Sequence, residues 1–212
     1  ACDLPLLVDA DHGYGNALNV RRTVEELEMA GVAALSIEDT DLPTPYGADG
    51  KASLISLDEG IGKMKAALDA RIDPDLVIAG RTSAAAIAGV DEAVRRARAY
   101  EDVGVDALFM VGLKSREELE AVASAVNTPI ILGSATKDMM DLNYLGPLGV
   151  RVCLQGHKVF AAAIEAIYRT QSALRNGVAP GDLEDIASSD LMNRLMRNDD
   201  YAGWTKAFLE DD

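Results

Sequence analysis

The chain has 212 residues, 49% of them hydrophobic, which is enough for one domain with a sizeable core. Its 20 Lys and Arg against 35 Asp and Glu give a formal net charge of −15, which argues against nucleic acid and anionic membranes as partners. Cys2 and Cys153 lie far apart, so neither a disulfide framework nor a zinc site is supported. With no bilayer-length apolar run and no signal-peptide pattern, the sequence predicts a soluble cytoplasmic protein.

Six short apolar runs without strict alternation are typical of strands buried on both faces. They occupy residues 4–9, 33–38, 76–81, 106–111, 129–132 and 150–154. Amphipathic helices are expected between them; Val20, Val24 and Leu27, for example, share one helical face. Before three of the strands the helix ends in a Gly-Val dipeptide, at Gly31, Gly104 and Gly149. The alternation predicts a parallel α/β sheet, either doubly wound or closed into a barrel.

The residues that follow the strands favour the barrel. Polar or charged residues or glycine loops follow strand after strand, as in a (β/α)8 TIM-type barrel, whose active site collects the carboxyl ends of its strands. Because only six strands are visible and the first begins almost at residue 1, we expect a barrel that lacks its first two βα units. The predicted domains are a catalytic barrel of residues 1–176 and a C-terminal helical extension of residues 177–212. The apolar residues of that extension cover either its own barrel or a partner subunit.

The first strand leads Asp9 and Asp11 into a glycine-bearing loop, and Glu38 ends the second strand. Alternate residues of a strand point the same way, so Asp9 and Asp11 leave together. Converging carboxylates repel each other unless a cation or proton intervenes, and oxygen ligands of this kind suit Mg2+ or Mn2+. The D-x-D spacing alone leaves two interpretations open, a divalent metal site or carboxylates that cap nearby backbone groups.

Arg81 ends the third strand and is a cation suited to a bidentate hold on a substrate carboxylate. Carboxylates for a metal and an arginine for an anion together predict an oxyacid site. His157, after the last strand, is a candidate to orient a departing carboxylate or assist enolate protonation, the alternative being a residue that merely begins a helix. For His12, beside the glycines, we expect a structural role.

These motifs resemble the isocitrate lyase/phosphoenolpyruvate mutase superfamily. The similarity runs through residues 9–16, 30–39, 79–82 and 91–100 and covers most of residues 3–170. The resemblance implies a (β/α)8 barrel, usually a dimer of dimers with an exchanged C-terminal helix. It also implies a Mg2+ bound directly by Asp11 and largely through water by Asp9 and Glu38. Substrates in the superfamily are 2-oxo or 2-hydroxy acids and phosphonates, which react at C–C or P–C bonds through a metal-stabilised enolate.

Positions at which the sequence departs from the motifs of the superfamily indicate which of its branches the chain resembles. Lyases of the superfamily carry a cysteine loop after the second of these strands, but residues 40–51 contain neither cysteine nor histidine. Mutases and phosphonate hydrolases tend to have a histidine where this chain has Val111, Gly112 and Leu113. The oxaloacetate decarboxylase branch is similar in residues 9–19 and in the position of His157. The tyrosine of that branch after the seventh barrel strand is replaced here by Ser134 and its neighbours.

The predicted reaction is therefore the Mg2+-dependent decarboxylation of a small 2-oxo dicarboxylate, oxaloacetate, to pyruvate and CO2. A 2-oxo acid chelates the metal, which takes up the charge as CO2 departs. Arg81 and His157 are the expected catalytic and substrate-binding residues, and Ser134 is a further expected substrate contact. Two alternatives stay open: another C–C or P–C lyase or mutase of the superfamily, and a non-catalytic fragment that binds only a metal or a partner subunit.

Overall fold

The structure is a computed structural model that describes residues 4–210. It divides into two compact units, Ala1–Gly156 and His157–Asp212. The sequence places the boundary after residue 176, whereas the structure groups the preceding helix with the C-terminal residues. Cys153 is a free, half-buried thiol, and Cys2 lies outside the described residues. Within residues 4–210 we find no helix both long and apolar enough to cross a bilayer.

The first unit is built on one parallel sheet whose strands follow one another in chain order, β1 to β6. The strands are β1 (Leu7–Asp9), β2 (Ala34–Glu38), β3 (Val77–Thr82), β4 (Ala107–Met110), β5 (Ile130–Leu132) and β6 (Val150–Cys153). A doubly wound sheet reverses its strand order at a switch point, and this sheet does not. Its six strands therefore form an α/β half-barrel. The prediction of six parallel strands is confirmed.

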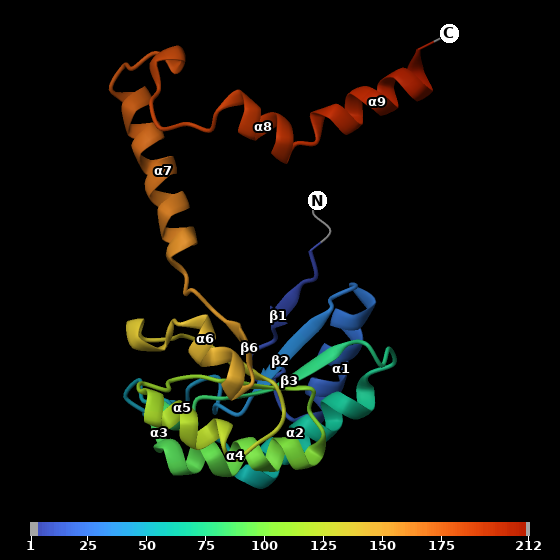
Figure 1. The fold of residues 1–212 in the computed structure, drawn as a ribbon, viewed down its shortest axis with the longest axis vertical. Helices are drawn as coiled ribbons and strands as arrows, with labels where there is room; N and C mark the ends of the chain where they lie inside the picture. Colours follow the sequence, from blue (N-terminus) through green and yellow to red (C-terminus); the bar gives the residue numbers. More distant parts are fainter. Residues whose placement is uncertain (1–3, 211–212) are drawn as a thin grey trace. The chain divides into compact units, whose positions relative to one another are not determined.

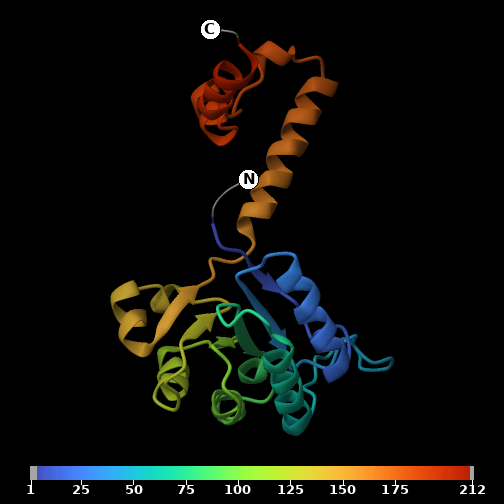
Figure 2. The ribbon, with the colours of Figure 1, turned by 90° about the vertical axis from the view of Figure 1, so that its right-hand side faces the viewer.

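Helices cover one face of this sheet (Figures 1 and 2). The longer ones are α1 (Ala17–Met29), α2 (Leu57–Ala70), α4 (Val90–Val103) and α5 (Arg116–Ala123). Shorter elements in the connections are α3 (Ala84–Ile87), η1 (Lys137–Met139), α6 (Leu142–Leu145) and η2 (Gly146–Leu148). The side chains of Asn16, Ser56 and Ser115 accept hydrogen bonds from first-turn amides, which explains where α1, α2 and α5 begin. All three glycines of the Gly-Val dipeptides have positive φ, as expected.

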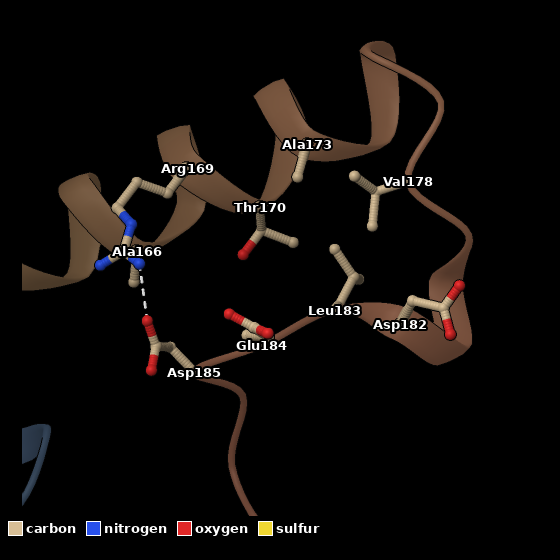
Figure 3. A pocket seen from close by; sticks show the side chains of 9 residues that line it. All are labelled: Ala166, Arg169, Thr170, Ala173, Val178, Asp182, Leu183, Glu184 and Asp185. Atoms are coloured by element: carbon tan, nitrogen blue, oxygen red, sulfur yellow. Dashed lines mark hydrogen bonds and ion pairs between the residues drawn. The ribbon is translucent and has the colours of Figure 1, made fainter.

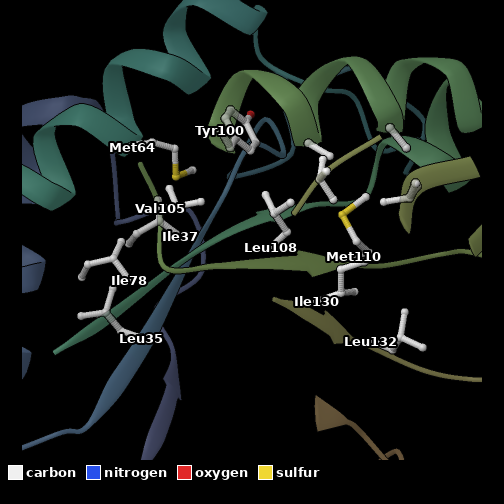
Figure 4. Packing of buried hydrophobic residues seen from close by; sticks show 14 of the residues in the cluster. Leu35, Ile37, Met64, Ile78, Tyr100, Val105, Leu108, Met110, Ile130 and Leu132 are labelled. Carbon is white, nitrogen blue, oxygen red and sulfur yellow. The ribbon is translucent and has the colours of Figure 1, made fainter. Parts of the chain in front are cut away.

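The main core lies between the sheet and these helices (Figure 4). Met64 of α2 and Tyr100 of α4 pack there against strand residues that include Leu35, Ile78 and Leu108. Because alternate strand residues point to opposite faces, the remaining side chains face away from the helices. We call this other side the inner face. It carries a smaller apolar cluster of Ala79, Ala107, Phe109 and Ile131.

The second unit consists of α7 (Lys158–Arg175), η3 (Pro180–Asp182), α8 (Ser189–Leu195) and α9 (Asn198–Leu209). None of its described residues is buried. Large apolar side chains are exposed on α7 and α9, among them Phe160 at 71%, Ile167 at 63% and Phe208 at 77%. Apolar surface on this scale is typical of an interaction site.

Candidate active site

Three of the predicted site residues meet at the carboxyl ends of neighbouring strands on the inner face. Arg81 Nη1 forms an ion pair with Asp9 Oδ2, and Arg81 Nε lies 3.4 Å from Glu38 Oε2. The sheet register explains this contact, because β2 and β3 pair Glu38 with Arg81, while β1 and β2 pair Asp9 with Ser36. The parallel pairing of the strands thus brings Asp9 and Arg81 into contact, although they lie 72 positions apart in the sequence.

Arg81 and Glu38 are held in a largely enclosed setting. The Glu38 side chain is 6% exposed and that of Arg81 18% exposed. Thr40 Oγ1 donates a hydrogen bond of 2.9 Å to Glu38 Oε2. The guanidinium carbon of Arg81 lies 5.3 Å from the centroid of the Phe109 ring, in cation–π contact. Arg81 Nε is buried and faces Glu38 Oε2 without forming a hydrogen bond in the described part of the chain.

The backbone of Asp11 is hydrogen-bonded to two members of this group, Asp9 and Glu38. Glu38 N donates a hydrogen bond of 2.8 Å to Asp11 O, and Asp11 N donates one of 3.1 Å to Asp9 Oδ1. Asp11 has a φ of 46°, a left-handed conformation that residues other than glycine seldom adopt. The residue is exposed, and no hydrogen bond or ion pair within residues 4–210 engages its carboxylate. The backbone of Asp11 is therefore fixed and its side chain is available.

The donor chemistry at this edge fits a divalent cation, because three carboxylates supply the oxygen ligands that Mg2+ and Mn2+ prefer. The positions of these carboxylates relative to one another match a metal site less well than their chemistry does. No three His, Cys, Asp or Glu side chains gather closely enough to hold an ion in the part of the chain that the structure describes. The positive charge that contacts Asp9 and Glu38 comes from Arg81. A metal-binding role for Asp9, Asp11 and Glu38 thus remains a prediction.

Ser134 and His157 are both exposed. Ser134 follows β5 and makes no hydrogen bond with Asp9, Glu38 or Arg81. His157 is the first residue of the second unit and the N-cap position of α7, where its side chain makes no capping hydrogen bond. The roles expected for these two residues in substrate binding remain predictions.

The sequence interpretation missed a buried polar cluster directly behind Glu38. Asp39 is fully buried, and its Oδ2 accepts hydrogen bonds from Arg96 Nη1 at 2.9 Å and from the Tyr100 hydroxyl at 2.6 Å. Burial, together with the charge of Asp39, raises the pKa of Tyr100 far above its ordinary value and keeps the hydroxyl protonated. A signal was present, because Arg96 falls on the apolar stripe of α4 between Ala93 and Tyr100. A charged residue in such a stripe indicates a buried partner.

A separate pocket of about 350 Å3 lies entirely within the second unit (Figure 3). Its lining consists of Ala166, Arg169, Thr170, Ala173, Val178, Asp182, Leu183, Glu184 and Asp185. An ion pair of 2.6 Å joins Arg169 and Asp185, whose side chains are 61% and 71% exposed. The pocket contains none of the predicted site residues and no buried polar group, so we assign it no function.

Comparisons with known proteins show which family the chain resembles. A family model described as phosphoenolpyruvate phosphomutase matches residues 1–186. The chain is 56% identical over 209 residues to an oxaloacetate decarboxylase of Bradyrhizobium sp. (strain ORS 278). This match covers 99% of this chain and 72% of the relative. It is 59% identical over 197 residues to an oxaloacetate decarboxylase of Bradyrhizobium diazoefficiens, over 93% of this chain and 68% of the relative.

Among solved structures, phosphonopyruvate hydrolase in complex with oxalate and Mg2+ superposes with a TM-score of 0.82 at 27% identity. The match covers 99% of this chain and 74% of that chain. The resemblance to the isocitrate lyase/phosphoenolpyruvate mutase superfamily is confirmed. Since the family model spans most of the sequence and the curated relatives are more than half identical to it, the chain belongs to the phosphoenolpyruvate phosphomutase family.

Proposed function

We propose that this chain is a Mg2+-dependent decarboxylase that converts oxaloacetate, a small 2-oxo dicarboxylate, to pyruvate and CO2. The observation that carries the proposal is the meeting of Asp9, Glu38 and Arg81 at adjacent strand ends, with Asp11 beside them. The relatives named oxaloacetate decarboxylase support the choice of substrate. The neighbouring hydrolase structure, with oxalate and Mg2+, supports a divalent metal beside a small dianion.

Each residue has a proposed task. Arg81, whose side chain is 18% exposed at the carboxyl end of β3, binds a substrate carboxylate through its guanidinium. Asp11 holds the metal directly, and Asp9 and Glu38 hold it largely through water. Mg2+, when bound, supplies the positive charge that stabilises the electron pair left as CO2 departs. His157 orients the departing carboxylate or assists protonation of the enolate, and Ser134 is a further substrate contact.

The connection between β2 and α2 supports decarboxylation over cleavage of isocitrate-type substrates. Retro-aldol cleavage needs a positioned acid or base, and residues 40–51 contain no cysteine or histidine to serve as one. Decarboxylation needs chiefly a cationic electron sink and an anion clamp, and the cluster around Arg81 offers the residues for both.

The same proposal includes the larger assembly. The unreversed order of the six parallel strands supports a (β/α)8 barrel to which these βα units belong. The exposed apolar side chains of α7 and α9 support a homo-oligomer, for which we propose a dimer of dimers in which the C-terminal helices are exchanged. Light scattering at several protein concentrations measures the number of subunits, and a monomer at all of them would contradict this part.

The test of the activity is pyruvate release from oxaloacetate, with and without Mg2+, measured by a coupled lactate dehydrogenase assay. Because Mg2+ alone promotes this reaction in solution, the rate without protein is subtracted. We expect protein-dependent pyruvate release that disappears with EDTA and returns with Mg2+ or Mn2+. Glyoxylate from isocitrate or methylisocitrate, or pyruvate and phosphate from phosphonopyruvate, without pyruvate from oxaloacetate, would overturn the proposed substrate.

A further inference from the structure

Lys63 is a buried charge to which the proposed function assigns no task. It lies on α2 with 2% of its surface exposed, and its Nζ donates a hydrogen bond of 2.9 Å to the backbone oxygen of His12. Lysine is almost never buried to this extent without a partner. Burial lowers the pKa of Lys63, and the negative charges of Glu59, Asp39 and other nearby carboxylates act against that shift.

The oxygen that Lys63 binds belongs to the turn that carries Asp11. Four successive carbonyl groups of this turn accept hydrogen bonds. The donors are Gly13 N to Ala10 O at 3.0 Å, Glu38 N to Asp11 O at 2.8 Å, Lys63 Nζ to His12 O, and Thr23 Oγ1 to Gly13 O at 3.2 Å. They come from the turn itself, from β2, from α2 and from α1, so three surrounding elements fix its course. Lys63 is the charged donor of the four.

The turn depends on this support because its backbone conformation is unfavourable. Asp11 and Tyr14 have φ values of 46° and 59°, and Gly13 between them has a φ of 73°. Residues other than glycine remain in this region only where their surroundings hold them there. At Gly13 any side chain would in addition collide with Val20 of α1. Loss of one support is therefore expected to alter the turn locally rather than the whole fold.

We propose that Lys63 is a positioning residue for the metal site: by fixing the carbonyl group of His12, it sets the direction in which the neighbouring Asp11 carboxylate points. The inference rests on the proposed function, because that function makes Asp11 the direct metal ligand. Lys63 acts through the turn and touches neither metal nor substrate. Residues that orient metal ligands in this way typically change metal affinity by about 10- to 100-fold when they are replaced.

The experiment compares Lys63→Met with Lys65→Met. Methionine keeps an unbranched side chain in the core and removes the charged donor. Lys65 lies two positions further along α2 and is exposed, so its replacement is the matched control. Binding of Mn2+ alone is measured from the electron paramagnetic resonance signal of the free ion, without substrate, after circular dichroism has verified the fold. We expect the Kd for Mn2+ to rise by at least about tenfold in Lys63→Met and to stay unchanged in Lys65→Met.

A folded Lys63→Met protein with the Mn2+ affinity of the original chain overturns the inference and leaves the proposed function intact. If the original chain binds no Mn2+, the proposed metal site fails, and the inference fails with it. Should Lys63→Met not fold, lysine-labelled original protein is titrated with Mg2+ and followed by NMR. A shift of the Lys63 signal without a shift of the Lys65 signal supports the inference, and an unmoved Lys63 signal contradicts it.

Discussion

Tyr100 on α4 donates a hydrogen bond of 2.6 Å to Asp39, the residue that directly follows Glu38 at the end of β2. Arg96 donates to the same oxygen, and its other terminal nitrogen donates to Ile55 O at 2.8 Å. The second oxygen of Asp39 is buried without a hydrogen-bond partner in the part of the chain described here. Helix α4 thereby fixes the end of β2 from the helix side, while Glu38 faces the inner side.

Replacing Tyr100 by Phe should destabilise the protein measurably, because it removes one of two donors to a buried carboxylate. Hydrogen bonds to charged groups contribute about 1.5–3 kcal/mol, and we expect a loss of that size in urea unfolding followed by circular dichroism. Tyr144→Phe is the control, since the Tyr144 hydroxyl donates to Glu120 at 3.0 Å in an exposed setting. Equal losses in the two variants would contradict a special role for the Asp39 contact.

The raised pKa of the Tyr100 hydroxyl also predicts that the folded protein loses stability at high pH. Burial and the charge of Asp39 raise the pKa of Tyr100 above its ordinary value of 10.0. In the unfolded chain Tyr100 loses its proton near pH 10, while the folded protein keeps it, so the stabilisation is complete below that pH and declines above it. One such group contributes a slope of at most about 1.4 kcal/mol per pH unit. Urea midpoints measured from pH 8 to 11 should fall less steeply in Tyr100→Phe, and identical slopes would refute the assignment.

Two glycines of α2 offer a paired test of the packing around Tyr100. A side chain at Gly60 would collide with the Tyr100 hydroxyl, whereas at Gly62 no atom lies within 4 Å. In an open helix, alanine is favoured over glycine by about 0.8–1 kcal/mol. We therefore expect Gly62→Ala to raise the melting temperature and Gly60→Ala to lower it, the latter at a cost of about 1–3 kcal/mol. Stabilisation by both substitutions would show that Tyr100 does not occupy this position.

The sheet was predictable because its signals are local. Short runs of apolar residues and the glycines before β2, β4 and β6 identify the strands without knowledge of their neighbours. Convergence of Asp9, Glu38 and Arg81 followed from one further rule, that parallel strands end at the same edge of a sheet.

The partners of buried polar side chains were not predictable in the same way. The apolar stripe of α4 indicates that Arg96 is buried but does not name its partner, and only the packing of α2 and α4 against the sheet brings Lys63 to His12 O and Arg96 to Asp39. The position of the boundary between the two units was not predictable for the same reason, because it depends on how a helix packs. The apolar periodicity of α7 does not reveal whether the helix packs on the sheet or groups with the residues that follow it.

Asp11→Ala should abolish Mg2+-dependent oxaloacetate loss and preserve the fold, since no hydrogen bond or ion pair engages the Asp11 carboxylate within the described residues and its backbone bonds persist. Asp185→Ala is the control for the backbone conformation, because Asp185 also has a left-handed backbone, with a φ of 56°; unlike Asp11, Asp185 forms an ion pair, with Arg169. Activity is measured at saturating Mg2+ and melting by circular dichroism. Substantial activity in Asp11→Ala would exclude this residue as the principal metal ligand.

His157→Gln tests whether a proton or carboxylate is handled at the start of α7. Glutamine keeps an amide of similar reach but cannot exchange a proton near neutral pH, so a general acid at this position is lost while any packing role is largely retained. We expect turnover of oxaloacetate to fall by roughly 10- to 1,000-fold, with the Kd for Mn2+ unchanged, because His157 is not a proposed metal ligand. Unaltered pyruvate release would remove the role of His157 alone, whereas a loss of Mn2+ binding equal to the loss of turnover would place this residue with the metal ligands instead.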